Sequence, residues 1–216
     1  AAEALATTAI LRIYANDGPT YKPVLYESAS QKYEVYYKAG TEFGDQITLK
    51  DAGHAGLNQL DEFSFEAYGD AVEAASGTAT LRIYANDGAQ YSGSNVVGNN
   101  MPGTLLYTSD AISLKDGYQT YTVSDISGVS LPSEVTWAVE FSAGATAGLV
   151  LGGTDITGSS LNDFWQKDSG GWTLYQPDDA SESADFVAKL VAQSSLLDAK
   201  MPGSLLYTSD AIAVKD

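Results

Sequence analysis

Two segments from the middle of this 216-residue chain occur again near its two ends. The segment LRIYANDG occupies residues 81–88 and, unchanged, residues 11–18. The segment MPGTLLYTSDAISLKD occupies residues 101–116 and recurs at 201–216 with three of its sixteen positions changed, namely Thr104/Ser204, Ser113/Ala213 and Leu114/Val214. We therefore expect the end copies to be able to form the same local structure as the middle copies.

The middle copies have the pattern of β-strands. Leu81, Ile83 and Ala85 take every second position, which places them on one face of a strand. Asn86-Asp87-Gly88 then predicts a turn, because these residues tolerate positive φ and bond their own backbone. Residues 105–114 return to a β-like composition. The sequence thus predicts two strands joined by a loop, 89–100, that is long for a hairpin.

The repeats do not form a simple tandem array, because one pair is offset by 70 residues (81 − 11) and the other by 100 (201 − 101). One hypothesis is strand exchange, in which the chain lends its first strand to one neighbour and its last strand to another. Such a contact joins different surface patches, so it propagates into a filament unless its rotation closes a ring. Two other interpretations stay open: three hairpins of one ancestral type in one domain, or copied segments that are not native to the chain. Strand exchange predicts subunit contacts at Ala9, Leu11, Ile13, Leu205, Tyr207 and Ile212.

Period-two alternation recurs along the rest of the chain and is clearest at residues 134–142. Residues 152–162, which are rich in Gly, Thr, Ser and Asp, are predicted to be a loop, and no segment has a convincing helical pattern. The sequence predicts an all-β protein, an antiparallel jelly-roll-type β-sandwich with terminal strand extensions. We expect the sandwich domain at 21–193, with extensions at 1–20, the candidate donor strand, and at 194–216.

The charge of the chain excludes several classes of partner. Lys and Arg number 11 and Asp and Glu 28, which gives a formal net charge of −17. Such a surface repels nucleic acids and anionic lipids, and it favours divalent cations. Without cysteine, the chain has neither disulfides nor thiolate metal sites. No apolar run is long enough for a membrane-spanning helix, so we expect no membrane span.

Six segments between Tyr26 and Ala192 carry a resemblance: FGDQITL (43–49), FSFEAYGD (63–70), LRIYANDG (81–88), PGTLLYTSD (102–110), WAVEFS (137–142) and GSSLNDFWQKDSGGWTLY (158–175). On these segments the chain resembles bacterial secreted proteins that carry a Pro-Glu-Pro C-terminal sorting signal. The resemblance implies an exported, surface or extracellular β-sandwich. It implies no activity, because that group is largely of unknown function. The sorting signal itself is missing from these residues.

The sequence offers no arrangement of catalytic groups. His54, the only histidine, lies in a predicted loop and has no nucleophile motif beside it, as a Ser-His-Asp triad would require. Glu66, Glu140 and Asp61 fall on predicted strands, but nothing in their spacing singles out the acid pair of a glycosidase. We therefore expect no catalytic residue, no enzymatic activity and no cofactor.

Two kinds of binding site are compatible with the sequence. Calcium takes about six to eight oxygen ligands, and Asp87 and Asp163 supply oxygens at predicted turns, although no Asp-x-Asp-x-Asp-Gly loop is present. Bonds from such residues to their own backbone explain them as well. Trp165, Trp172 and Tyr175 fall on one predicted hairpin, where aromatic rings could stack on a sugar. Aromatic residues at period-two positions are also ordinary core residues.

These features predict a non-enzymatic extracellular structural protein, a subunit of a bacterial filament or surface assembly whose copies join by strand exchange or addition. The partner would be further copies of the chain in a homopolymer. The alternative is a carbohydrate-binding surface module of a secreted bacterial protein, with a glycan as its partner. Either function places the protein outside the cell or at its surface, with no nucleic-acid partner.

Overall fold

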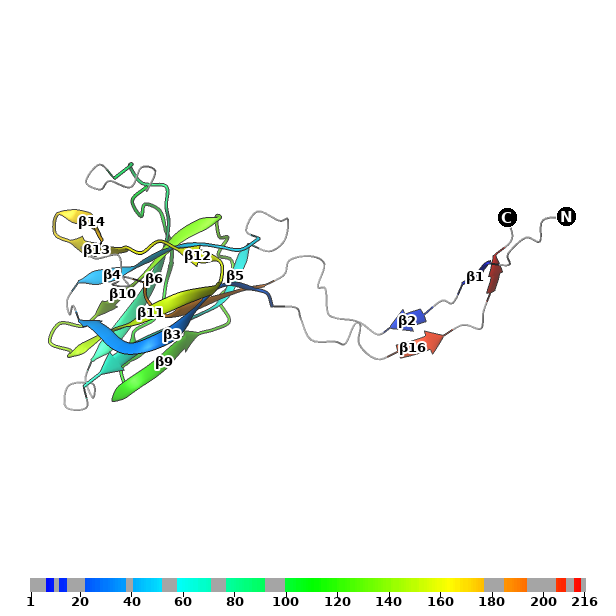
Figure 1. Cartoon of the computed structure of the whole chain (residues 1–216), viewed down its shortest axis with the longest axis horizontal. Coiled ribbons are helices and arrows are strands. Elements are labelled where there is room, and N and C mark those ends of the chain that lie inside the picture. Colours follow the sequence, from blue (N-terminus) through cyan, green and yellow to red (C-terminus); the bar gives the residue numbers. More distant parts are fainter. Residues whose placement is uncertain are drawn as a thin grey trace.

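In the computed structural model of this chain, two antiparallel β-sheets pack face to face as a sandwich (Figure 1). The structure describes residues 7–9, 12–14, 22–37, 41–51, 58–70, 77–91, 100–176, 185–193, 205–208 and 212–214. Those residues contain no helix, and hence none long and apolar enough to cross a membrane. The predicted antiparallel β-sandwich is confirmed.

The larger sheet is organised around β10 (Glu134–Phe141). This strand pairs with β4 (Glu42–Thr48) on one edge and with β6 (Thr78–Ala85) on the other. The strand order is β14-β13-β4-β10-β6-β7, with β12 added to β4 and β8 added to β6. The other strands of this sheet are β7 (Leu105–Thr108), β8 (Ile112–Ser113), β12 (Ser159–Ser160), β13 (Phe164–Asp168) and β14 (Gly171–Tyr175).

The smaller sheet has the order β11-β3-β15-β5-β9. Its strands are β3 (Val24–Tyr37), β5 (Gln59–Gly69), β9 (Gly117–Val123), β11 (Ala147–Thr157) and β15 (Ala188–Gln193). Strand β11 pairs with β5 only through residues 147–149. From Ala188 onward, β15 replaces β11 as the strand that pairs with β5. At this exchange, the backbone N–H of Gly152 donates to the carbonyl oxygen of Asp185 over 2.7 Å. The segment that leads into β15 is thereby held against the middle of β11.

Residues 152–162 are not the loop that their composition predicts. Strand β11 continues through them to Thr157, and β12 follows. The register of β11 against β3 shifts between Val150 and Gly152 and again on both sides of Asp155, as in bulged strands. The prediction was wrong because pairing with a distant strand, rather than the weak strand propensity of Gly, Thr and Asp, holds this segment extended.

The core lies between the two sheets and is filled largely by aromatic rings. Alternate residues of β10 point into it and are fully buried: Val135, Trp137, Val139 and Phe141. The ring of Trp137 contacts Phe63 and Phe186 of the opposite layer, with centroids 5.3 and 6.3 Å apart. Because each aromatic side chain buries about 150–250 Å² on folding, this row is a major source of stability.

The two copied ends of the chain pair with each other. Strand β2 (Arg12–Tyr14) pairs with β16 (Leu205–Thr208), and β1 (Thr7–Ala9) pairs with β17 (Ile212–Val214). We call these four strands the terminal ribbon; Figure 1 shows it apart from the sandwich, beside the N and C termini. The strand-exchange hypothesis placed the two end strands in different neighbouring subunits. In the structure of the single chain, they pair with each other and form one ribbon.

The terminal ribbon repeats the pairing of β6 with β7 and β8, which we call the edge ribbon. In the edge ribbon Arg82, Ile83 and Tyr84 pair with Thr108, Tyr107 and Leu105; in the terminal ribbon Arg12, Ile13 and Tyr14 pair with Thr208, Tyr207 and Leu205. The register shift falls at the same step in both. Ala9 pairs with Ile212 as Ala79 pairs with Ile112. Residues 86–104 join the two sides of the edge ribbon, whereas residues 15–204, with the whole sandwich, join those of the terminal ribbon.

Replacing Phe141 by alanine should lower the free energy of unfolding by about 3–5 kcal/mol, because it leaves a cavity at a fully buried position. Urea unfolding followed by tryptophan fluorescence would measure this. The matched control is Leu105→Ala, whose side chain is 50% exposed and whose loss should change stability far less. Similar losses from both variants would contradict the core described above.

Candidate functional site

The predicted sugar-stacking residues do not form one platform. Trp165 is fully buried, and its Nε1–H donates to Oε1 of Gln46 over 3.1 Å. In the β13–β14 register, Trp165 and Trp172 fall on one face of the hairpin and Tyr175 on the other. The ring of Tyr175 stacks on Phe164, with centroids 5.3 Å apart. A hairpin with its aromatics divided in this way presents no continuous aromatic surface to a sugar.

Trp172 belongs instead to a contact on the outer face of the larger sheet. Its ring meets Tyr84 edge-on at 5.3 Å, and the Nζ of Lys167 lies 5.2 Å from the centre of the Trp172 ring. Such cation–π contacts contribute about 0.5–1 kcal/mol at exposed sites. Trp172 therefore helps to hold the β13–β14 hairpin against the rest of the sheet.

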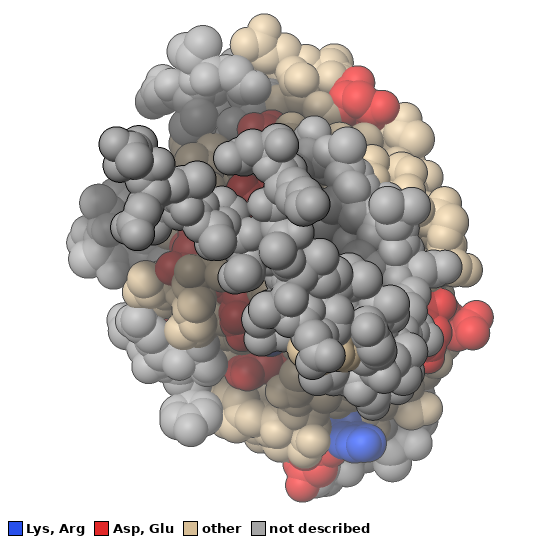
Figure 2. Space-filling view, turned by 90° about the vertical axis from the view of Figure 1, so that its right-hand side faces the viewer, with Lys and Arg blue, Asp and Glu red and all other residues tan. Residues whose placement is uncertain are grey.

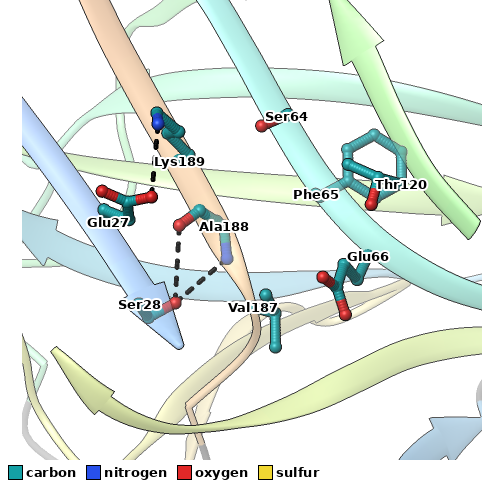
Figure 3. A pocket seen from close by; sticks show the side chains of 9 residues that line it. All are labelled: Glu27, Ser28, Ser64, Phe65, Glu66, Thr120, Val187, Ala188 and Lys189. Carbon is teal, nitrogen blue, oxygen red and sulfur yellow. Dashed lines mark hydrogen bonds and ion pairs between the residues drawn. The ribbon is translucent and has the colours of Figure 1, made fainter. Parts of the chain in front are cut away.

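The carboxylates that sequence reasoning considered for catalysis lie at separate places. Asp61 forms an ion pair with Lys22 at 2.7 Å, and Glu140 forms one with Arg82 at 2.8 Å. Glu66 lines a small pocket of about 190 Å³ between β3, β15 and β5 (Figure 3). In that pocket, Glu27 is paired with Lys189 at 3.2 Å. These contacts are those of a polar sheet face, and His54 lies outside the described residues.

Asp45 is the residue that departs most from an ordinary sandwich core. It lies on β4 between Phe43 and Ile47, and it pairs with Trp137 of β10, so its side chain faces the interior. It is 0% exposed, like both of its apolar neighbours on that face. Sequence reasoning missed it, although the alternation of Phe43, Asp45 and Ile47 already puts all three on one face.

Three further aspartates approach Asp45 from other elements: Asp155 of β11, Asp163 just before β13, and Asp185 just before Phe186. We call these four residues the carboxylate cluster. Asp155 accepts hydrogen bonds from the Tyr26 hydroxyl (3.0 Å) and from the backbone N–H of Ser160 (2.7 Å). The Ser160 hydroxyl also bonds the Asp185 side chain. The cluster therefore unites residues far apart in sequence.

Local backbone geometry brings Ser160 to the cluster. Strand β12 turns back from β11 at Gly158, whose φ of +73° is unfavourable for other residues. A side chain at Gly158 would also come within 2.6 Å of the Thr48 carbonyl oxygen. Beyond this turn, Ser159 and Ser160 pair with Thr48 and Ile47 of β4. The turn thus places Ser160, which donates a hydrogen bond to Asp155, beside the strand that carries Asp45.

Burial raises the pKa values of Asp45, Asp163 and Asp185, and neighbouring aspartates add to this rise for Asp45 and Asp185. Burial, followed by the charges of Asp185, Asp163 and Asp155, holds the pKa of Asp45 well above its ordinary value. Burial chiefly raises the pKa of Asp163 to about 6 and that of Asp185 to about 7, the latter with help from Asp155. The charges of Asp155 and Asp163 thus make ionisation of both Asp45 and Asp185 harder.

The carboxyl groups of Asp45 and Asp163 are incompletely satisfied. Neither oxygen of Asp45 has a hydrogen-bond partner; the backbone N–H of Phe186 points toward it and lowers its pKa, but without hydrogen-bond geometry. Oδ1 of Asp163 also lacks a partner, whereas Gln176 bonds its side chain. A buried polar group without a partner costs about 1–3 kcal/mol, and a charged one costs more.

The other predicted calcium residue, Asp87, has a different setting. It is exposed, and its two carboxylate oxygens accept hydrogen bonds from the backbone N–H and the hydroxyl of Thr104, both at 2.7 Å. These bonds, first that from the backbone, lower the pKa of Asp87. Asp87 therefore behaves as a turn residue, as its sequence context also allowed.

Neither a protein-family model nor a curated protein sequence matches this chain.

Without metal ions, the protein should lose stability as the pH rises from about 4 to about 7. The folded-state pKa values of Asp163 and Asp185, about 6 and about 7, exceed the ordinary 3.8, so the folded state holds protons that the unfolded chain has released. Urea unfolding in EDTA would measure this. Asp185→Asn should flatten the dependence, whereas Asp110→Asn, an exposed matched control, should not. Equal slopes in all three proteins would contradict the burial of these carboxyl groups.

Proposed function

We propose that this protein is a non-enzymatic structural subunit that acts outside the cell and joins copies of itself through the terminal ribbon. The observation that carries the proposal is that β2 and β16 of the terminal ribbon share both sequence and register with β6 and β7 of the edge ribbon. A ribbon that repeats part of the sandwich has a partner surface defined in advance, namely the surface that the edge ribbon covers.

The edge of the terminal ribbon that corresponds to this surface is open among the described strands. In the sandwich, β6 pairs with β7 and β8 on one side and with β10 on the other. In the terminal ribbon, β2 and β1 have the counterparts of β7 and β8, and no described strand takes the place of β10. Open strand edges tend to pair with another chain, because their backbone groups lack partners.

The complementary strand in a neighbour is β10, which that neighbour's own edge ribbon covers. Because the two ribbons share most of their sequence and the register of β2 with β16, one can take the place of the other by strand exchange. The contact joins two different surfaces, so each added copy leaves a further ribbon open and growth continues as a filament.

The setting outside the cell is supported by composition. A net charge of −17 and the lack of cysteine suit a soluble β-protein outside the cell. Figure 2 shows more acidic than basic side chains among the coloured residues on the face turned toward the terminal ribbon. Such a surface disfavours random contacts between copies, which leaves strand pairing as the specific one.

Deletion of residues 1–18 should convert an assembling protein into a monomer while the sandwich stays folded. The deletion removes β1 and β2, and with them the edge that is proposed to pair with β10, but none of the sandwich strands. Light scattering coupled to size-exclusion chromatography would give the mass, and near-ultraviolet circular dichroism the fold. A full-length chain that is already monomeric at high concentration, or a deletion that still assembles, would refute the proposal.

A pair of cysteines can identify the acceptor strand, because the chain has none of its own. Arg82 and Ala138 are directly paired across β6 and β10, and Arg12 holds the position of Arg82 in the terminal ribbon. Arg12→Cys with Ala138→Cys should therefore give a ladder of disulfide-linked chains on a non-reducing gel. Arg82→Cys with Ala138→Cys is the matched control and should close a disulfide within one chain. If the control closes and the test pair gives no ladder, β10 is not the acceptor.

A further inference from the structure

The carboxylate cluster poses an electrostatic problem that the protein groups around it do not solve. Asp45 is fully buried with neither oxygen hydrogen-bonded, and Asp163 is 1% exposed with one oxygen unbonded. Neither of them takes part in the ion pairs found among the described residues, which involve Asp61, Glu42, Glu140 and Glu27. Buried charges in proteins are normally paired with opposite charges or coordinated to metals.

The groups of the cluster are all oxygen donors. They comprise four carboxyl groups and the hydroxyl of Ser160, which lies 3.4 Å from both Oδ1 and Oδ2 of Asp155 and also bonds Asp185. No nitrogen or sulfur ligand of the kind that zinc or copper prefers has been identified there. Hard cations such as Ca²⁺ take about six to eight oxygen ligands in flexible geometry, and Mg²⁺ demands a stricter octahedron.

The residues of the cluster differ in how deeply they are buried. Asp45 and Asp163 are buried, whereas Asp155, Ser160 and Asp185 are only half-buried. The cluster thus extends from the surface to the core side of β4, with Asp45 at its inner end. A metal ion could reach the half-buried residues first and displace the protons of the inner carboxyl groups, as metal binding to carboxylates generally does.

We propose that the carboxylate cluster binds one divalent cation of calcium type, with Asp45 and Asp163 as its inner ligands and Asp155 and Asp185 as its outer ligands. In the present arrangement, no three acidic or histidine side chains of the described part of the chain already stand as a metal site. Binding therefore draws the carboxylates inward by side-chain rotation, and backbone carbonyl groups or water complete the shell. The bound ion joins β4, β11 and the segments before β13 and β15.

Of the two residues that the sequence predicted for calcium, the proposed site contains Asp163 and not Asp87. The sequence offered Asp87 and Asp163 as separate turn residues. In the structure only Asp163 lies with further carboxylates, while both oxygens of Asp87 are bonded by Thr104. The site lies wholly within the sandwich, so it does not depend on the assembly of the terminal ribbon.

The experiment is thermal unfolding of the full chain at neutral pH, with EDTA or with added Ca²⁺, Mg²⁺, Mn²⁺ or Zn²⁺. A site in the folded protein should raise the Tm by about 5–10 °C when free Ca²⁺ exceeds its Kd about 100-fold. Mg²⁺ should raise it less. A Tm that none of these ions changes would overturn the proposal.

Substitutions test the position of the site. Asp45→Asn keeps the shape of the side chain but removes an inner charge, so the calcium-dependent rise in Tm should be lost. In EDTA, the same variant should be at least as stable as the parent, because it carries no buried charge. Asp110→Asn, the exposed control of equal charge change, should keep the full rise.

Asp163→Asn provides a second test in case Asp45→Asn fails to fold. It too should lose the rise in Tm, and a full rise in either folded variant would place the ion elsewhere and refute the proposal. Terbium, a luminescent ion with oxygen preferences like those of calcium, gives an independent readout. Its emission should be sensitised through Tyr26, whose hydroxyl bonds Asp155, and should fall in Tyr26→Phe. Emission that Asp45→Asn and Asp163→Asn leave unchanged would contradict the site.

Discussion

The pairing of β10 with β4 on one side and with β6 on the other determines how the larger sheet contributes to the core. Because it runs the whole length of β10, it sets which residues of three adjacent strands face the core. The inward row of β10 joins the two sheets through Trp137. The same register places Asp45 opposite Trp137, so the constraint that builds the core also buries a carboxyl group. A shift of one residue would exchange the two faces of β4 and bring Asp45 to the surface.

Much of the architecture follows from local sequence pattern. Alternation at residues 81–85 and 134–142 predicted β6 and β10, because each strand has one apolar face. The division of the aromatics on β13 and β14 also follows from period two, but only once the hairpin register is known. Trp165 and Tyr175 are ten residues apart in a strand–turn–strand unit, and their faces depend on where the turn falls. For this reason, the sequence grouped residues that the structure separates.

The carboxylate cluster lies beyond what the sequence could predict. Asp45 could be placed on the core face of its strand from its neighbours alone. The positions of Asp155 and Asp185 beside it could not be predicted in this way. They depend on the bulges in β11 and on the point where β15 replaces β11 as the neighbour of β5. These are long-range pairings, and one of them involves residues 152–162, a segment of weak strand propensity that composition identified as a loop. The copied ends were likewise predicted as strands, but their pairing with each other required the structure.

The outer face of β6 explains why a copied ribbon could be specific for this sandwich. Arg82 makes ion pairs with Glu140 at 2.8 Å and with Glu42 at 3.3 Å, and Tyr84 contacts Trp172. The edge ribbon thus engages β10, β4 and β14 by side chains as well as by backbone. The terminal copy has an arginine at position 12 and a tyrosine at position 14, in the same register as Arg82 and Tyr84. An unrelated strand could match the backbone bonds of β10, but it would leave Glu42, which is buried, with only its longer contact to Lys167 at 3.8 Å. Because a buried carboxylate that loses its arginine is costly, the sequence of the ribbon would discriminate, in the proposed assembly, between its own kind of sandwich and other open sheets.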